Sequence, residues 1–121
     1  MKKILVVDDD SDICYAMKEG FFTEYDIQTA ESGKKCFRYL ESEIPDLIIL
    51  DIMMPDMNGW EVIQRLKASE NWKEIPIIII TARSDDVVRK AGGFYADDFI
   101  EKPFTTNDLK RRINNLLYQK K

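Results

Sequence analysis

The hydrophobic positions of the chain fall into short apolar runs that alternate with segments of helical spacing. Apolar runs predict five strands, at residues 2–7, 26–30, 46–51, 75–80 and 96–100. Apolar residues spaced by three or four predict five helices, with first turns near Ser11 or Asp12, Ser32, Asn58, Ser84 and Thr105. This alternation predicts a parallel sheet with helices on both faces, joined by right-handed crossovers.

The run at residues 46–59, DLIILDIMMPDMNG, is the most informative. Its apolar residues are typical of a strand buried on both faces, and Asp51 is the one charge among them. A lone carboxylate in the middle of such a strand has a large desolvation cost, so we expect Asp51 where the strand leaves the sheet. A cap of the next helix is the alternative role, but Asp56 and Asn58 are better placed for it.

Local signals also indicate where two later helices start and stop. Gly92 and Gly93 are expected to end the fourth helix early. Thr105, followed three residues later by Asp108, resembles a capping box and predicts the start of the last helix.

Composition narrows the class of protein. The 121 residues are enough for one domain, residues 1–121, and 45% hydrophobic with 33% charged residues is typical of a soluble globular protein. The net charge of -4, with scattered Lys and Arg, argues against direct binding of nucleic acid. The N-terminal apolar run is too short for a signal peptide or a membrane span, so we expect a cytoplasmic protein with no membrane contact.

The chemistry open to the chain is limited by its residue types. No histidine is present, which excludes Ser-His-Asp and Cys-His catalysis and His-ligated metal sites. Cys14 and Cys36 lie within helical patterns, outside any CxxC pair, and we expect buried or half-buried thiols in a reducing compartment.

Polar residues follow the strand ends and are expected to converge at one edge of the sheet. Asp8 and Asp9 follow the first strand, Asp51 ends the third, Thr81 ends the fourth and Lys102 follows the fifth. Three clustered carboxylates require a cation, and an oxygen-only site of this kind suits Mg²⁺. A lysine and a hydroxyl can bind phosphoryl oxygens, and a carboxylate can serve as a nucleophile. Taken singly, the threonine could cap a turn and the lysine could be a surface residue; their conjunction favours a site.

Four motifs in this order, VVDDD, LIILDIMMPDMNG, IIIITA and KPF, resemble those of the receiver domain of two-component response regulators. The resemblance covers the whole chain. It implies a three-layer flavodoxin-like fold, (βα)5, with strand order 2-1-3-4-5.

The resemblance also implies a phosphorylation site. Asp51 would be the phosphate acceptor, and Asp8 and Asp9 the acidic pair that binds Mg²⁺ with Asp51 and the backbone carbonyl of Met53. The implied partners are a sensor histidine kinase or a histidine phosphotransfer protein, and a downstream protein effector. The protein would be a signalling phosphoacceptor, catalysing only its own phosphorylation and dephosphorylation.

Further residues match the switch of the family. Thr81 would be the switch hydroxyl, Lys102 would pair with the phosphoryl group, and Phe99 matches the switch aromatic. The bond between Lys102 and Pro103 is expected to be cis. The implied output surface is formed by the fourth helix, the fifth strand and the fifth helix.

The chain departs from the family pattern near that surface. Phe99 lacks the hydroxyl of the frequent Tyr, and the spacing from Thr81 to Lys102 is one residue shorter. Residues 90–96, KAGGFYA, replace the usual end of the fourth helix, with Tyr95 where Gly is usual.

Three other functions compete with this interpretation. A flavin-binding electron carrier would need a Ser-, Thr- and Gly-rich loop after the first strand, where three aspartates would repel the FMN phosphate. A phosphatase with an Asp nucleophile usually carries a second Asp two residues later, where this chain has Met53. A receiver-like interaction module that acts without phosphorylation has no need of the full acidic set.

Overall fold

The computed structural model describes residues 1–21, 23–82 and 96–118. Five parallel strands form one sheet, and they are Lys3–Val7 (β1), Asp26–Ala30 (β2), Leu47–Asp51 (β3), Ile77–Thr81 (β4) and Asp98–Glu101 (β5). Their order is β2-β1-β3-β4-β5, as the sequence predicted. The central strands β1 and β3 pair in register, Ile4 beside Leu47 and Val7 beside Leu50, so their carboxyl ends lie together.

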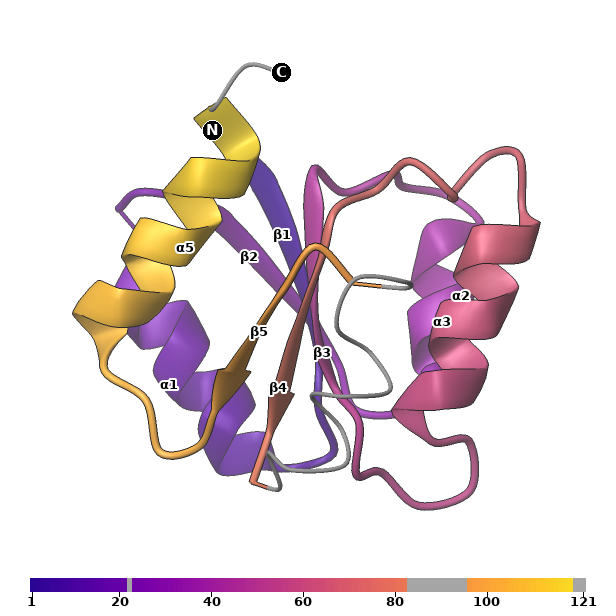
Figure 1. Cartoon of the computed structure of the whole chain (residues 1–121), viewed down its shortest axis with the longest axis horizontal. Helices are drawn as coiled ribbons and strands as arrows, with labels where there is room; N and C mark the ends of the chain where they lie inside the picture. The colour runs from indigo at the N-terminus through magenta and orange to yellow at the C-terminus, as the bar shows by residue number, and fades with distance from the viewer. Residues whose placement is uncertain (22, 83–95, 119–121) are drawn as a thin grey trace.

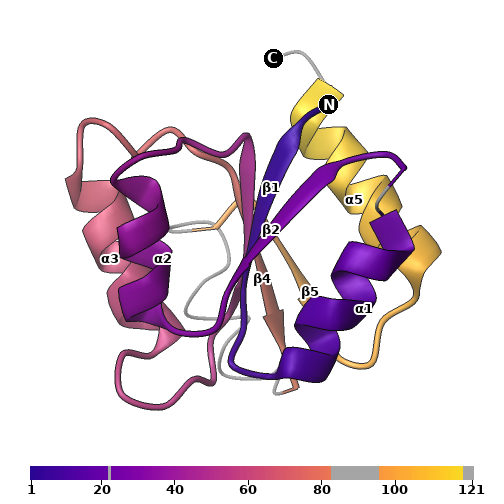
Figure 2. The same cartoon turned by 180° about the vertical axis from the view of Figure 1, so that it is seen from behind.

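Helices cover both faces of the sheet. The described residues form four, Ser11–Phe21 (α1), Gly33–Leu40 (α2), Gly59–Ala68 (α3) and Thr106–Tyr118 (α5). α1 and α5 pack on one face, and α2 and α3 pack on the other (Figures 1 and 2). The expected fourth helix, from Ser84 to its glycine end at Gly92 and Gly93, lies outside the described residues.

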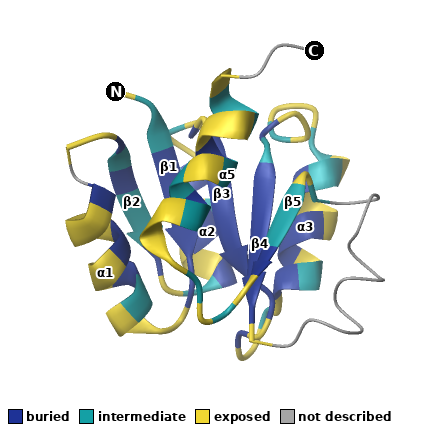
Figure 3. Cartoon of the chain, turned by 60° about the vertical axis from the view of Figure 1, so that its left-hand side comes forward, coloured by how far each residue is buried: buried dark blue, intermediate teal, exposed yellow. Residues whose placement is uncertain are grey.

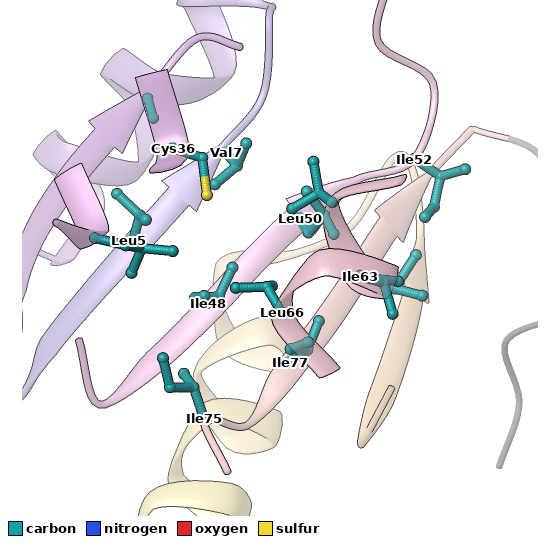
Figure 4. Close-up of a cluster of buried hydrophobic side chains, with 14 of the residues drawn as sticks. Leu5, Val7, Cys36, Ile48, Leu50, Ile52, Ile63, Leu66, Ile75 and Ile77 are labelled. Atoms are coloured by element: carbon teal, nitrogen blue, oxygen red, sulfur yellow. The ribbon is translucent and has the colours of Figure 1, made fainter. Parts of the chain in front are cut away.

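Alternating side chains of each strand supply two separate cores. One core, under α2 and α3, contains Leu5, Val7, Ile48, Leu50, Ile77 and Ile79. The other, under α1 and α5, contains Ile4, Val6, Leu47, Ile49, Ile78 and Ile80. Figure 3 shows β3 and β4 buried along their lengths, and Figure 4 shows Ile63 and Leu66 of α3 beside the strands of the first core. The two-sided burial explains the continuous apolar runs of the sequence.

Two strands, β4 and β5, start two residues later than predicted, where the local hydrogen bonding is irregular. β4 was expected over 75–80 but spans Ile77–Thr81, because Pro76 has no amide hydrogen for the ladder. β5 was expected over 96–100 but spans Asp98–Glu101. There the Asp97 carboxylate accepts the Ile77 amide at 2.8 Å, and the Asp97 amide donates to the Ile77 carbonyl at 2.9 Å.

Helix caps were partly predicted. Asn58 caps α3 in a full capping box with Glu61. The predicted cap of α1, Ser11 or Asp12, was wrong. The cap is Asp10, whose carboxylate accepts the Asp12 amide at 2.9 Å.

The start of α5 follows only half of the predicted capping box. The Thr105 hydroxyl accepts the Asp108 amide at 3.0 Å. The Asp108 carboxylate binds Arg111 and Arg112 instead of returning to the cap residue. The same Arg112 donates to Asp98 and to the carbonyl of Phe99, at 2.8 and 3.1 Å. These contacts fix α5 against the first residues of β5.

Both cysteines are buried and free, as predicted. Burial raises the pKa of the Cys14 thiol to about 11 and that of Cys36 to about 12. Both thiols are therefore protonated at neutral pH, and neither is a reactive nucleophile.

Candidate functional site

Three polar side chains are buried at the carboxyl edge of the sheet. Asp8 directly follows β1, Asp51 is the last residue of β3, and Thr81 is the last residue of β4. Their exposed fractions are 0%, 3% and 0%. They are as buried as the apolar residues that precede them in the strands. Parallel pairing brings the three strand ends together, so the sequence prediction of a shared edge is confirmed for these residues.

The carboxylates form one cluster. Single oxygens of Asp8, Asp9 and Asp51 lie within 4.8 Å of one another, with Asp9 exposed and the other two buried. The backbone amide of Asp10 donates to Asp8 Oδ1 at 2.9 Å and fixes that carboxylate. The DDD triplet thus contains one buried acid, one exposed acid and one helix cap.

Lys102 reaches the same cluster from the end of β5. Its Nζ donates to Asp8 Oδ2 at 3.2 Å and lies 3.7 Å from Asp51 Oδ2. Its backbone amide donates to the carbonyl of Thr81 at 2.8 Å, and its bond to Pro103 is cis, as the sequence predicted. Burial alone would lower the pKa of the Lys102 amine, but the adjacent Asp51 and Asp8 raise it above its usual value. The amine is therefore a fixed positive charge at neutral pH.

Burial also governs the ionisation of Asp51. It raises the pKa of this carboxyl from 3.8 to about 6, and the nearby charge of Asp8 adds to the increase. The Met53 amide, which donates to Asp51 Oδ1 at 3.1 Å, and the charge of Lys102 oppose it. Asp51 is consequently mostly ionised at neutral pH but remains a partly desolvated charge.

The loop after Asp51 is held closely against α3. The Gly59 amide donates to the Ile52 carbonyl at 3.0 Å. A Cβ at Gly59 would lie 2.6 Å from the Ile52 Cα, closer than atoms can pack, so glycine is required there. Asp56 in the same loop has a positive φ of 63°. The packing fixes the backbone around Met53, whose side chain is exposed.

The donor atoms fit a hard divalent cation. All of the clustered ligands are carboxylate oxygens, without sulfur or nitrogen ligands, which is the donor set that Mg²⁺ prefers. Two buried like charges beside a third also favour a cation in the cluster, since Lys102 alone balances only part of them. Asp8, Asp9 and Asp51 are therefore the residues that would hold the metal.

Phe99, the predicted switch aromatic, lies near the site but not in it. It pairs with Ile79 in the sheet register, is half-buried, and packs against the core under α2 and α3. Sequence reasoning missed the capping role of Asp10. The available signal was its position directly before Ser11, where aspartate is a favoured cap.

Comparisons with known proteins agree with this geometry. Residues 4–114 match the family model described as the response regulator receiver domain. The chain is 38% identical over 125 aligned residues to the response regulator SaeR of Staphylococcus aureus, covering all of this chain and 53% of SaeR. The chain thus spans about half the length of the curated relatives it matches.

Solved structures show the same fold. A signal receiver domain of a histidine kinase from Syntrophus aciditrophicus superposes with a TM-score of 0.87 at 32% identity, covering 100% of this chain and 96% of that one. The receiver domain of the sensor histidine kinase PA1611 from Pseudomonas aeruginosa superposes with a TM-score of 0.86 at 24% identity, covering 96% and 97%. That structure contains a magnesium ion in its active-site cleft. In the part of the present chain that is described, no helix has the length and apolar character needed to cross a bilayer. From its motifs, fold and relatives, the chain belongs to the response regulator receiver domain family of two-component signalling.

Proposed function

We propose that Asp51 accepts a phosphoryl group from a phosphohistidine of a sensor histidine kinase or a histidine phosphotransfer protein, and that residues 1–121 act as one receiver domain. The observation that supports this most is the cluster of Asp8, Asp9 and Asp51 with the Lys102 amine 3.7 Å from the Asp51 carboxylate. A surface ion pair has no need of two buried acids. A phosphoryl-transfer site needs both a carboxylate nucleophile and positive charge around it.

The Asp51 carboxylate is suited to be the nucleophile. With a pKa of about 6 it is mostly ionised at neutral pH, so an oxygen lone pair is available. In the reaction that we propose, a carboxylate oxygen forms a bond to phosphorus while the bond from phosphorus to the donor imidazole nitrogen breaks. The electron pair of that bond stays on the imidazole nitrogen, which takes up a proton from solvent, so the products are an aspartyl phosphate and a neutral histidine. Oδ1 is held by the Met53 amide, which leaves Oδ2, on the side of Lys102, as the attacking atom.

Neighbouring groups would stabilise the transferred charge. Asp8, Asp9 and Asp51, with the Met53 carbonyl, are the proposed ligands of Mg²⁺, which when bound neutralises charge on phosphoryl oxygens. Lys102 supplies a second positive charge from a fixed position, because Asp8 already orients its amine. The hydroxyl of Thr81, at the end of the adjacent strand, is the proposed hydrogen-bond donor to the phosphoryl group.

The proposed output is a change in the surface near Phe99. Movement of Thr81 towards the phosphoryl group would open space beside β4, and the half-buried ring of Phe99 lies on the next strand. Since a phenyl ring has no hydroxyl to satisfy, its inward movement carries no polar desolvation cost. The altered surface would then be recognised by a downstream protein effector, so the chain acts as a signalling phosphoacceptor and not as an enzyme with a separate substrate.

Intact mass spectrometry after incubation with a small acyl-phosphate donor tests the proposal. We expect one phosphate adduct on the wild-type protein in Mg²⁺, none in excess chelator, and none on Asp51→Ala. Asp56→Asn is the matched control, since this exposed loop aspartate lies outside the cluster and asparagine tolerates its positive φ. An adduct that survives in Asp51→Ala, or equal labelling without metal, would refute the assignment. No adduct on the wild-type protein from the acyl phosphate or from a panel of kinases would instead support a phosphorylation-independent interaction module.

A further inference from the structure

A small cleft between α2 and α3 lies apart from the carboxylate cluster. It has a volume of about 250 Å³ and is lined by Lys34, Phe37, Arg38, Glu41, Met57 and Arg65. The lining residues from α2 are spaced by three or four, so they share the helix face towards α3. The cleft is smaller than the usual pocket for a metabolite, roughly 300 to 1,000 Å³, and matches one inserted side chain.

The charge of this cleft is opposite to that of the protein. Three of its six lining residues, Lys34, Arg38 and Arg65, are basic, against one acid, Glu41. Within the part of the chain that the structure describes, none of the three forms an ion pair, whereas the bases Lys3, Lys73 and Lys110 each do. The whole chain carries a net charge of -4. The cleft is therefore a local positive site with donors available to a ligand.

An aromatic side chain positions one of these bases. The Arg65 guanidinium lies 5.6 Å from the ring centroid of Phe37, within range of a cation–π contact. A guanidinium stacked on a ring keeps its edge donors, which match the two oxygens of a carboxylate. Phe37 also packs against Trp72, whose ring centroid lies 5.5 Å away. Arg65 is thus partly preorganised for a carboxylate.

The apolar part of the cleft is also fixed in place. Met57 is half-buried in the loop before α3, and its sulfur lies 2.6 Å from where a Cβ on Gly33 would be. The loop and the first turn of α2 therefore pack closely, and a larger residue at Gly33 would require the Met57 side chain to move. Phe37 and Met57 form an apolar surface beside the three bases, so a ligand that combines carboxylates with an apolar group complements both parts.

We propose that the cleft between α2 and α3 binds an acidic peptide segment of a partner protein, with two or more carboxylates flanking one apolar side chain. The carboxylates bind Arg38 and Arg65, and the apolar side chain contacts Phe37 and Met57. A protein segment is favoured over a small polyanion because a polyanion would leave the apolar surface uncovered. This binding does not depend on phosphorylation of Asp51.

Fluorescence anisotropy with a short labelled peptide, rich in glutamate around one leucine, tests this directly. We expect saturable binding that weakens with added salt, and a change in the tryptophan emission of the protein, because the Trp72 ring contacts Phe37. Arg38→Gln and Arg65→Gln should each weaken binding by roughly threefold to tenfold, the range expected for an exposed charge-assisted contact. Arg111→Gln on α5, on the opposite layer, is the matched control and should bind as the wild-type protein does.

Two peptide controls separate the contributions. Replacing every glutamate by glutamine should abolish binding, and replacing the leucine by serine should weaken it. On peptide binding, amide chemical shifts of the wild-type protein should move on α2 and α3 and stay unchanged on α1 and α5. This measurement uses only the wild-type protein, so it does not depend on the folding of any variant. Equal affinity of Arg65→Gln and wild-type protein, shifts spread over both layers, or displacement of the peptide by tripolyphosphate at equal charge would each overturn the proposal.

Discussion

Replacing Asp51 by its neutral isostere should stabilise the metal-free fold at neutral pH. The carboxyl group is 3% exposed and lies beside Asp8, so its ionised form is disfavoured relative to the unfolded chain. Asp51→Asn keeps the shape of the side chain and removes the buried charge. We therefore expect the variant to have a larger free energy of unfolding than the wild-type protein in magnesium-free buffer.

The pKa gives both the size and the sign of the effect. A rise from 3.8 to about 6 means that the folded state retains the proton more tightly than the unfolded state. Wild-type stability is then highest with the carboxyl protonated, and it falls as pH rises from about 4 through about 6. The total loss is about 3 kcal/mol at about 1.4 kcal/mol for each pKa unit. The advantage of Asp51→Asn should thus be about 3 kcal/mol at about pH 7.5 and less than about 1 kcal/mol at about pH 4.

Urea unfolding followed by tryptophan fluorescence measures this difference. A gain of about 3 kcal/mol corresponds to a midpoint shift of roughly 1 to 3 M urea. Given Mg²⁺ binding as proposed, saturating Mg²⁺ should reduce the difference, because the folded wild-type cluster would bind the cation more tightly than that of the variant. Asp56→Asn, an exposed substitution of the same kind, should shift the midpoint little at either pH. The reasoning is refuted if Asp51→Asn gives no gain at neutral pH, or the same gain at both pH values.

Three other predictions concern the loop, the acceptor and the switch. Gly59→Ala should destabilise the fold by roughly 1 to 3 kcal/mol, since the added Cβ meets the Ile52 backbone. Gly20→Ala in α1, where the Cβ has open space around it, should stabilise the fold by roughly 0.5 to 1 kcal/mol, and thermal unfolding measures both changes. Given phosphorylation as proposed, Met53→Asn should shorten the lifetime of the aspartyl phosphate, because an amide can orient the attacking water and a thioether cannot; an unchanged decay of the adduct in mass spectrometry would contradict this. Phe99 should exchange between two positions on the microsecond to millisecond scale without phosphate, and a flat relaxation-dispersion profile for its amide and ring would exclude such exchange.

The sequence predicted the sheet well because burial on both faces leaves a simple pattern. A run such as the four isoleucines of β4 is typical of a strand covered on both sides, and the alternation of runs with amphipathic segments predicted a parallel sheet. The strand order was implied by the resemblance to receiver domains. The convergence of Asp8, Asp51 and Lys102 followed once the strand order was known, since neighbouring parallel strands place their carboxyl ends at one edge. Thr81 was placed correctly for the same reason.

Element ends and side-chain roles were less predictable. Strand starts near Pro76 and Asp97 depend on which amide finds which acceptor, and that choice is made across strands distant in sequence. Asp10 could not be separated from Asp8 and Asp9 by residue type, because all three are aspartates and only the third caps a helix. The contact of Met57 with Gly33 joins the loop before α3 to the first turn of α2, an approach that the helical pattern does not encode.

The division of the strand side chains into two cores has a consequence for protein engineering. Odd and even positions of β1 face different helix layers, so the sheet divides the interior into two hydrophobic cores that share no side chain. Recombination between relatives can exploit that partition. A chimaera that takes α2 and α3 from a relative needs only the strand residues facing them, such as Leu5, Leu50 and Ile79, while the α1 and α5 layer keeps its own complement. Exchanging only the strand residues that face the transferred helices, and not whole strands, would then preserve both cores.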